Sequence, residues 1–287
     1  MTMSVIRVGI IGVGATTESG PGAWGATAHL PALLASPRYK IVAIANSSVE
    51  SAKASIKYHN LDSSIKAYGS IDDIAQDPEI DIAVVSIWVS KHYAITKQLI
   101  LAGKDVYLEW PLGANTAYSF LDSFIHVLGN FTSLHSITKI AYPTLDLTGP
   151  DGENIPDHIF IHGTLESDAI VSIDYREPGG PSASGVGLRW IITGTEGEIE
   201  LTAPELMWQI GTPGATLRMR LRNKGSSEDV EYEDASEPDY IKNLAIPSKG
   251  VARSWEAFAT GDTDKYATFE QARAVLRTID AIRKGSL

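Results

Sequence analysis

The chain has 287 residues, of which 44% are hydrophobic and 21% charged, the profile of a globular protein. A net charge of −11 argues against nucleic acid or an anionic membrane as a partner. The chain has no cysteine, which excludes disulfides and thiolate metal sites and suits a reducing compartment, so we expect a cytoplasmic protein, with the nucleus as an alternative. The apolar run at 8–15 is too short and too rich in glycine for a membrane span or a secretory signal, so neither is expected.

The first half of the chain alternates apolar runs with helical patterns. Runs rich in Val and Ile predict buried strands at 5–13, 40–48, 81–88 and 105–110. Helices are expected at the end of 15–36, at 49–60 and at 92–104, and residues 67–80 predict a short strand and a short helix capped by Ser70. Strands that are apolar throughout need cover on both faces, so this pattern predicts a doubly wound parallel sheet. We assign residues 1–118 to a dinucleotide-binding Rossmann domain.

The second half changes character near residue 130, where short segments alternate apolar and polar residues between Gly, Pro and Asp turns. Alternation is typical of antiparallel strands with one covered face. The expected strands are 158–166, 169–177, 188–196, 197–203, 206–211 and 216–223. A hairpin turn is expected at 193–198, a solvated loop and edge strand at 226–239, and helices at 119–129 and 268–285. Residues 119–287 are therefore expected to form an α+β domain with a large antiparallel sheet, the domain boundary falling within 112–130.

A glycine turn follows the first strand. Gly12 and Gly14 would let backbone N–H groups of the turn, with Ala15 next to them, approach a pyrophosphate at a helix N-terminus. The third glycine of the G-x-G-x-x-G pattern is replaced by Thr17. The alternative is a plain strand-to-helix turn; the position at the start of a doubly wound sheet favours the nucleotide site.

The end of the second strand is the place where a Rossmann domain reads the adenosine ribose. Asn46, Ser47 and Ser48 stand there, without an acid to bind a 2′-hydroxyl and repel a 2′-phosphate, and Lys53 follows about one helical turn later. This favours NADP over NAD as cofactor. The alternative is that these small polar residues only cap the next helix.

These motifs together resemble the Gfo/Idh/MocA oxidoreductases. The residues that carry the resemblance are GIIGVG, AHLPAL, IVAIANSS, DIAVVSIWVSKHY, VYLEWPLGAN and IPDHIFIHGTL. Within the family the chain is most similar to the fungal galactose/lactose-metabolism regulatory proteins. The resemblance implies a nicotinamide-binding Rossmann domain followed by a domain with an open antiparallel sheet. It implies cofactor contacts at Gly12, Gly14, Ser86, Ile87, His92 and Glu109. Trp24 and Trp110 are further candidates beside the nicotinamide, with loop anchoring or simple packing as the alternative for each.

The sequence departs from the family at its catalytic positions. Trp110 stands where active members carry the lysine that moves the substrate proton, and alignment on Gly129 places Ser119 at the catalytic histidine and Asn115 at the first aspartate. Asp122 and His126 form another D-x-x-x-H pair, which we take as a coincidence of register. After Gly113 the chain also lacks the segment that would supply the next strand, so the sheet should have an exposed edge.

The leading functional hypothesis is therefore an NAD(P)-binding protein without catalytic residues, acting as a sensor or regulator through a protein partner. The rival is an NADP-dependent sugar or polyol dehydrogenase with another proton donor, and a third reading is a chain that has lost cofactor binding. No metal site is expected, because His158 and His162 share a strand face without a third ligand. A homodimer is expected through the outer face of the C-terminal sheet, since segments such as 170–175 and 188–193 carry apolar residues on both faces.

Overall fold

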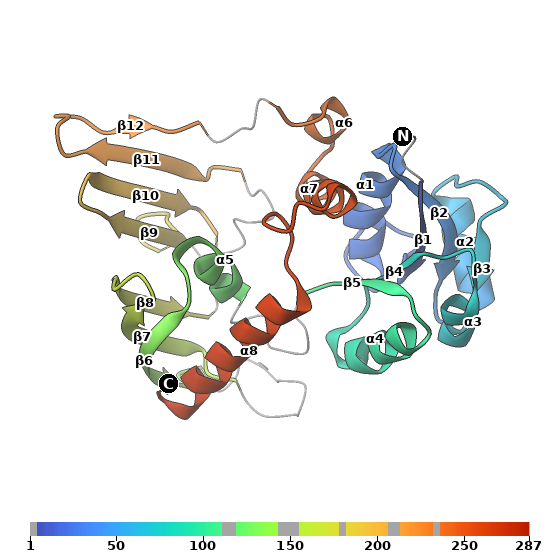
Figure 1. The fold of residues 1–287 in the computed structure, drawn as a ribbon, viewed down its shortest axis with the longest axis horizontal. Helices are drawn as coiled ribbons and strands as arrows, with labels where there is room; N and C mark the ends of the chain where they lie inside the picture. The colour runs from blue at the N-terminus through green and yellow to red at the C-terminus, as the bar shows by residue number, and fades with distance from the viewer. Residues whose placement is uncertain are drawn as a thin grey trace. The chain divides into compact units, whose positions relative to one another are not determined.

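A computed structural model gives the structure of residues 5–110, 119–142, 155–177, 182–205, 213–231 and 236–286. The chain forms two compact units (Figure 1). The first comprises Met1–Ser119, Thr148–Glu153 and Pro238–Leu276, and the second comprises Phe120–Leu147, Asn154–Glu237 and Arg277–Leu287. Within the ranges described, no helix has the length and apolar character needed to cross a bilayer.

The first unit is built on a five-stranded parallel sheet in the order β3-β2-β1-β4-β5. The strands are β1 (Ile6–Ile11), β2 (Tyr39–Ala45), β3 (Lys66–Tyr68), β4 (Ile82–Val85) and β5 (Asp105–Leu108). From β1 the chain winds outward to β3, then crosses to β4 on the other side of β1. The order therefore reverses between β1 and β4, and the predicted doubly wound sheet is confirmed. Among the described strands β5 is an edge, as expected from the missing segment.

Helices cover both faces of this sheet (Figure 1). They are a π-helical turn η1 (Gly25–His29), α1 (Leu30–Ala35), α2 (Val49–Tyr58), α3 (Ile71–Gln76), a 3₁₀ turn η2 (Val89–Lys91) and α4 (His92–Leu101). Their ends follow the local sequence. The Ser48 and Ser70 hydroxyls accept from backbone amides at the starts of α2 and α3, and Gly103 with φ 78° ends the turn after α4.

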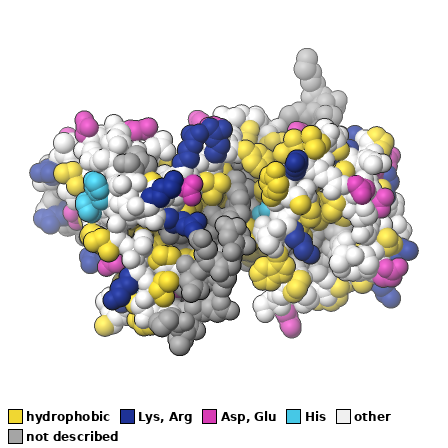
Figure 2. Space-filling model, turned by 90° about the horizontal axis from the view of Figure 1, so that it is seen from below, with side chains coloured by type: hydrophobic (Ala, Val, Ile, Leu, Met, Phe, Trp, Pro, Cys, Tyr) yellow, Lys and Arg dark blue, Asp and Glu magenta, His cyan; other side chains and the backbone are white. Residues whose placement is uncertain are grey.

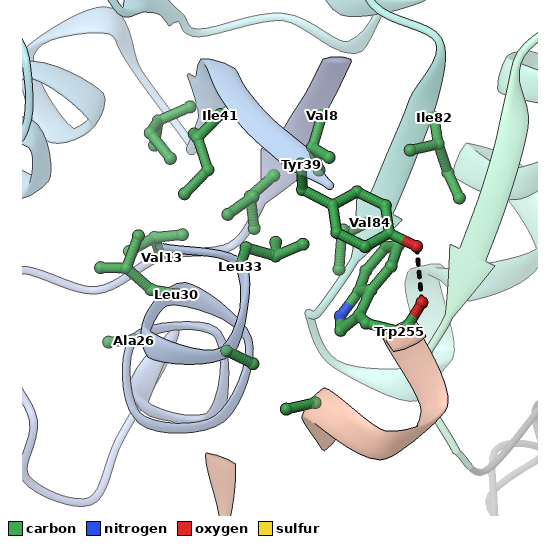
Figure 3. Close-up of a cluster of buried hydrophobic side chains, with 14 of the residues drawn as sticks. Val8, Val13, Ala26, Leu30, Leu33, Tyr39, Ile41, Ile82, Val84 and Trp255 are labelled. Atoms are coloured by element: carbon green, nitrogen blue, oxygen red, sulfur yellow. Dashed lines mark hydrogen bonds between the residues drawn. The ribbon is translucent and has the colours of Figure 1, made fainter. Parts of the chain in front are cut away.

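A C-terminal segment completes the core of the first unit. Helices α6 (Asp239–Lys242) and α7 (Ser248–Thr260) belong to this unit. Trp255 of α7 is 1% exposed and lies in one buried cluster with Val8, Leu33 and Val84 (Figure 3). This differs from the continuous division at residue 118. The reason is that residues far along the chain cover the apolar face of α1 and β1. Because these residues come after position 118, a division of the sequence at one point places them in the second domain.

Polar contacts fasten α7 to the sheet. The Tyr39 hydroxyl donates to the Trp255 carbonyl oxygen at 2.7 Å (Figure 3). The Arg38 guanidinium binds the Glu256 carboxylate through Nε at 2.9 Å, and the Tyr240 hydroxyl donates to the same carboxylate at 2.6 Å. Burial alone would raise the pKa of Glu256, but these two donors hold it below its ordinary value.

The second unit contains antiparallel sheets, as predicted. Its described strands form two of them, in the orders β6-β7-β8 and β12-β11-β10-β9, where one sheet was expected. The strands are β6 (Phe131–Lys139), β7 (His158–Leu165), β8 (Ile170–Arg176), β9 (Leu188–Thr193), β10 (Gly197–Ala203), β11 (Thr216–Leu221) and β12 (Glu228–Asp229). The hairpin between β9 and β10 is confirmed by the Gly194 amide donating to the Gly197 carbonyl oxygen at 2.8 Å. The strand expected at 206–211 lies outside the described residues.

The two helices expected in the second half of the chain are present, and they contribute to the second unit from Phe120 and from Arg277 onward. They are α5 (Ser119–Leu128), which precedes Gly129 at φ 88°, and α8 (Phe269–Lys284), which precedes Gly285 at φ 92°. Phe120 of α5 stacks on Tyr175 with ring centroids 5.3 Å apart, so α5 packs against the inner face of β8. Strand β6 was not predicted, because a bulge separates Phe131 from Leu134 and because Ile137 lies on the exposed face, so its apolar residues do not alternate.

Candidate functional site

The glycine turn lies at the point where the strand order reverses, which is where doubly wound sheets bind ligands. Gly12 has φ 95°, and a Cβ there would stand 2.1 Å from the backbone oxygen of Ser86, so only glycine fits between β1 and β4. A Cβ on Gly14 would stand 2.8 Å from the Pro21 carbonyl oxygen. The residues of the turn are thus packed too tightly for side chains at either position.

The backbone amides at the start of this turn already have protein partners. The bonds are Gly12 N–H to the Ala45 carbonyl at 2.9 Å, Val13 N–H to the Asn46 side-chain oxygen at 3.0 Å and Gly14 N–H to the Gly22 carbonyl at 2.9 Å. In this conformation the Gly12 amide is bonded to β2, and the Gly14 amide is bonded to the loop that follows the turn. The next amides, of Ala15 and Thr16, have no partner in the described parts of the chain.

Asn46 is used for structure in this conformation. Its side-chain oxygen accepts from the Val13 amide, and its nitrogen donates to the Val13 carbonyl at 2.8 Å and to the Ser55 hydroxyl at 3.0 Å. It thereby joins the ends of β1 and β2 to α2, which explains why an amide serves here, and the predicted cofactor contact of Asn46 stays a prediction. His59 adds a second clamp, with Nε2 2.8 Å from the Gly14 carbonyl oxygen.

The residues after Asn46 remain open to the outside. Ser47 is exposed, while the Ser48 hydroxyl caps α2 by accepting from the Ser51 amide at 3.1 Å. Helix capping thus accounts for Ser48. Ser47 remains as an exposed polar side chain at the strand end where Rossmann domains generally bind the adenosine ribose.

The end of β4 contributes to the same edge of the sheet. Ser86 is buried against Gly12, and Ile87 follows it beside the turn. His92, at the start of α4, is 3% exposed and has Nε2 2.9 Å from the Ile87 carbonyl oxygen. His92 therefore supports the backbone of the loop after β4, and its imidazole has no open face toward a ligand.

Glu109 follows β5 and is held by three groups. The His29 Nε2 lies 2.5 Å from its Oε1, and the Trp110 backbone N–H and the Trp24 indole N–H also lie close to the carboxylate. Burial alone would raise the pKa of Glu109, but these donors hold it below the ordinary value. Trp24 lowers the pKa of Glu109 by proximity, because its Nε1 does not have the geometry of a full hydrogen bond. The Nε1 atoms of Trp24 and Trp110 are both buried without a hydrogen-bond partner in the described structure.

The catalytic positions of active relatives are only partly visible. Asn115 and the Ser119 side chain lie outside the described residues. Asp122 and His126 lie on α5 in the second unit; burial raises the pKa of Asp122, and the nearby His126 opposes this. Trp110 has a buried indole Nε1 and no titratable group, so the position of the lysine has no proton carrier.

The histidines of the second unit form contacts within its sheet. His158 Nδ1 lies 2.7 Å from the Asp157 carboxylate, which also accepts from the backbone amides of Ala141 at 2.7 Å and Tyr142 at 2.6 Å. His162 faces His135 across the strand pair, with ring centroids 5.5 Å apart. In the regions that the structure describes, no group of three or more metal-ligating side chains occurs.

Sequence reasoning missed three residues of this site. His29, His59 and Trp255 contact Glu109, the glycine turn and His29, respectively. The histidine of the AHLPAL segment was a usable signal for His29, because a histidine within an apolar helix must find polar partners. No local signal connects Trp255 to residues more than 200 positions earlier.

Comparison with known proteins decides the family. Residues 6–120 match the family model described as "Oxidoreductase family, NAD-binding Rossmann fold", and residues 113–203 match that of the Gal80p C-terminal domain. Residues 6–120 belong to the Gfo/Idh/MocA oxidoreductase family, and residues 113–203 are similar to the C-terminal domain of Gal80p.

Two proteins similar to this chain in sequence are named as dehydrogenases. Dehydrogenase aclE of Aspergillus oryzae is 24% identical over 372 aligned positions, covering 98% of this chain and 96% of that protein. Bovine trans-1,2-dihydrobenzene-1,2-diol dehydrogenase is 33% identical over 85 residues, which is 30% of this chain and 24% of that enzyme.

Solved structures that are similar in fold are distant in sequence. The transcriptional regulator Gal80p from Kluyveromyces lactis aligns with a TM-score of 0.76 and 18% identity, covering 99% of this chain and 91% of that chain. An NAD-binding oxidoreductase from Klebsiella pneumoniae aligns with a TM-score of 0.71 and 16% identity, covering 98% and 97%. The alignment with aclE has 372 positions against 287 residues here, so at least 85 positions of it have no residue of this chain. Because both chains are covered almost end to end, the shortening is internal.

Proposed function

We propose that this protein binds a nicotinamide dinucleotide across the carboxyl ends of β1, β4 and β5. The observation that carries the proposal is the glycine turn at the switch point, where Gly12 has no room for a side chain. The amides of Ala15 and Thr16 would contact the phosphates, and the adenosine half would extend toward Ser47 at the end of β2. The nicotinamide half would then lie over β4 and β5, between Ile87 and Glu109.

NADP should bind at least as tightly as NAD. The exposed Ser47 carries no negative charge that would repel a 2′-phosphate, and the Lys53 ammonium lies on the first turns of α2, also exposed. An acid at this position normally selects NAD by holding both ribose hydroxyls. Calorimetric titration with each dinucleotide tests the proposal, and no heat from either ligand at millimolar concentration would refute it.

We propose further that the bound dinucleotide is sensed and not turned over. Oxidation of a hydroxyl carbon needs a group that takes the hydroxyl proton, and the indole at Trp110 cannot do so. Glu109 is held by His29 and is assigned to the cofactor. The fold likeness to the regulator Gal80p is consistent with a role exerted through a protein partner.

A working dehydrogenase is the second candidate, because the relative that matches almost the whole chain is named a dehydrogenase. The two functions are separated by measuring NADPH formation or consumption over a panel of sugars, sugar acids and inositols. We expect no appreciable turnover. Rates of about 1 per second or more would show that another residue carries the proton, and His126 and Tyr142 would be the first to replace.

A homodimer is the proposed assembly, formed through the outer face of the sheet β6-β7-β8. Ile137 and Phe160 are paired across β6 and β7 and are 69% and 41% exposed, and Ile170 at the start of β8 is 90% exposed. Large apolar side chains at neighbouring strands favour a self-complementary contact with a second copy. Hydrophobic side chains are also exposed on the face seen in Figure 2. In the first unit, the exposed ones include Trp88, Tyr93, Ile100 and Leu101, which lie on α4 and the turn before it. We retain the cytoplasm as the proposed location.

A further inference from the structure

A chain of buried polar groups connects α7 to the end of β5. The Trp255 indole N–H donates to His29 Nδ1 at 3.3 Å, and His29 Nε2 lies 2.5 Å from Glu109 Oε1. His29 is 0% exposed and Trp255 1% exposed, whereas the Glu109 side chain keeps 18% of its surface exposed. This chain of hydrogen-bonded groups therefore begins inside the core, at Trp255, and ends at the Glu109 carboxylate, which a ligand can reach.

The partner of each ring nitrogen defines the tautomer of His29. Nδ1 faces an indole N–H, which only donates, so Nδ1 must accept and Nε2 carries the proton that is donated to Glu109. Tyr107 fixes the plane of the imidazole from another side, with an edge-to-face contact at 5.1 Å between ring centroids. A proton cannot pass beyond Nδ1 toward Trp255, because the indole does not titrate. The arrangement therefore orients a carboxylate and does not relay protons.

The position of Glu109 suggests what it is oriented for. Its amide donates to the Val85 carbonyl oxygen at 3.2 Å, so Glu109 continues β5 beside the end of β4. With the adenosine half of a dinucleotide at β2, the half that reaches β5 carries the nicotinamide ribose. Its two hydroxyl groups are donors suited to an ionised carboxylate.

Building on the proposed function, we propose that His29 is a positioning residue for the cofactor. Oriented by Trp255, it holds the Glu109 carboxylate ionised and in place for the hydroxyls of the nicotinamide ribose. Helix α7, from the C-terminal part of the chain, thus contributes to dinucleotide affinity through His29, without touching the ligand.

The test separates the two halves of the ligand. Affinities for NADPH and for adenosine 2′,5′-bisphosphate, which has no nicotinamide ribose, are measured calorimetrically for the native protein and for His29→Leu, His29→Gln, Glu109→Gln and the double variant His29→Leu/Glu109→Gln. We expect His29→Leu to weaken NADPH binding roughly tenfold to a hundredfold and to leave binding of the fragment unchanged. His29→Gln, whose side-chain amide can donate from the place of Nε2, should restore much of the loss.

The outcomes distinguish this role from a structural one. If His29 acts through Glu109, adding His29→Leu to Glu109→Gln has little further effect on NADPH. Equal weakening of NADPH and the fragment, full additivity in the double variant, or unchanged NADPH affinity in His29→Leu would each overturn the positioning role while leaving dinucleotide binding intact. Binding of neither ligand by the native protein would instead overturn the proposed function, and this role with it.

Discussion

Replacing Trp255 by alanine should destabilise the first unit far more than any surface change of the same kind. The side chain is 1% exposed and stacks on Tyr107 with ring centroids 4.5 Å apart, and it meets Tyr39 edge-on at 4.9 Å. Truncating a buried tryptophan lowers the free energy of unfolding by about 3–5 kcal/mol. That is a large share of the roughly 5–15 kcal/mol that holds a typical domain folded.

Thermal unfolding followed by circular dichroism measures the effect. For a unit of this size, 3–5 kcal/mol corresponds to a fall in melting temperature of roughly 6–20 °C. The matched control is Trp88→Ala, which removes the same side chain from a position that is 70% exposed and should change the free energy of unfolding by less than about 0.5 kcal/mol. Similar melting temperatures for the two variants would refute the assignment of α7 to the core of the first unit.

Further predictions concern the turn, the cofactor preference, acid stability and assembly. Gly12→Val places a branched side chain against a backbone oxygen at φ 95°, so it should abolish dinucleotide binding in calorimetry or prevent folding; native-like affinity would contradict the packing of the turn. Ser47→Asp should shift the ratio of NADP to NAD affinities toward NAD by about tenfold or more, and an unchanged ratio would place the 2′-phosphate elsewhere. Burial alone would raise the pKa of Asp157, but backbone amides and His158 hold it lower. The ionised Asp157 stabilises the fold fully above its pKa in the unfolded chain, about 4, and this stabilisation is lost as the pH falls through its lower pKa in the folded protein. In urea titrations over that acid range, the free energy of unfolding of Asp157→Asn should therefore fall less than that of the native protein. Ile170→Glu should convert a dimer into a monomer in light scattering, and a native protein that is already monomeric would refute the proposed interface.

The sequence was sufficient for the strands of the first unit and for the helices between them, because their signals are local, whereas α6 and α7 of the same unit were not expected. Continuous apolar runs give the buried strands, and serine caps and a glycine stop give the helix ends at Ser48, Ser70 and Gly103. The site was harder to predict, since its hydrogen bonds join residues that no periodicity relates. Asn46 is of a residue type that often contacts ligands. Only the distances to Val13 and Ser55 show that its side-chain amide is already hydrogen-bonded within the protein.

The prediction of the second unit from its sequence was limited in a similar way. Alternation predicts β7, β8 and β9 well, but it says nothing about which strands share a sheet, so one sheet was expected where the described strands form two. In β6 the bulge near Phe131 shifts one apolar side chain by a position, and the outward-facing Ile137 removes the remaining alternation, so a period of two does not reveal the strand.

The late position of α7 in the chain affects the order of folding during synthesis. The ribosome produces β1–β5 long before Trp255, so the nascent sheet waits with the apolar surface around Val8, Leu33 and Val84 uncovered. A chain released early, or a fragment ending near residue 118, would keep that surface open to chaperones and to aggregation. The first half of this protein therefore cannot reach its final packing until α7 has been synthesised.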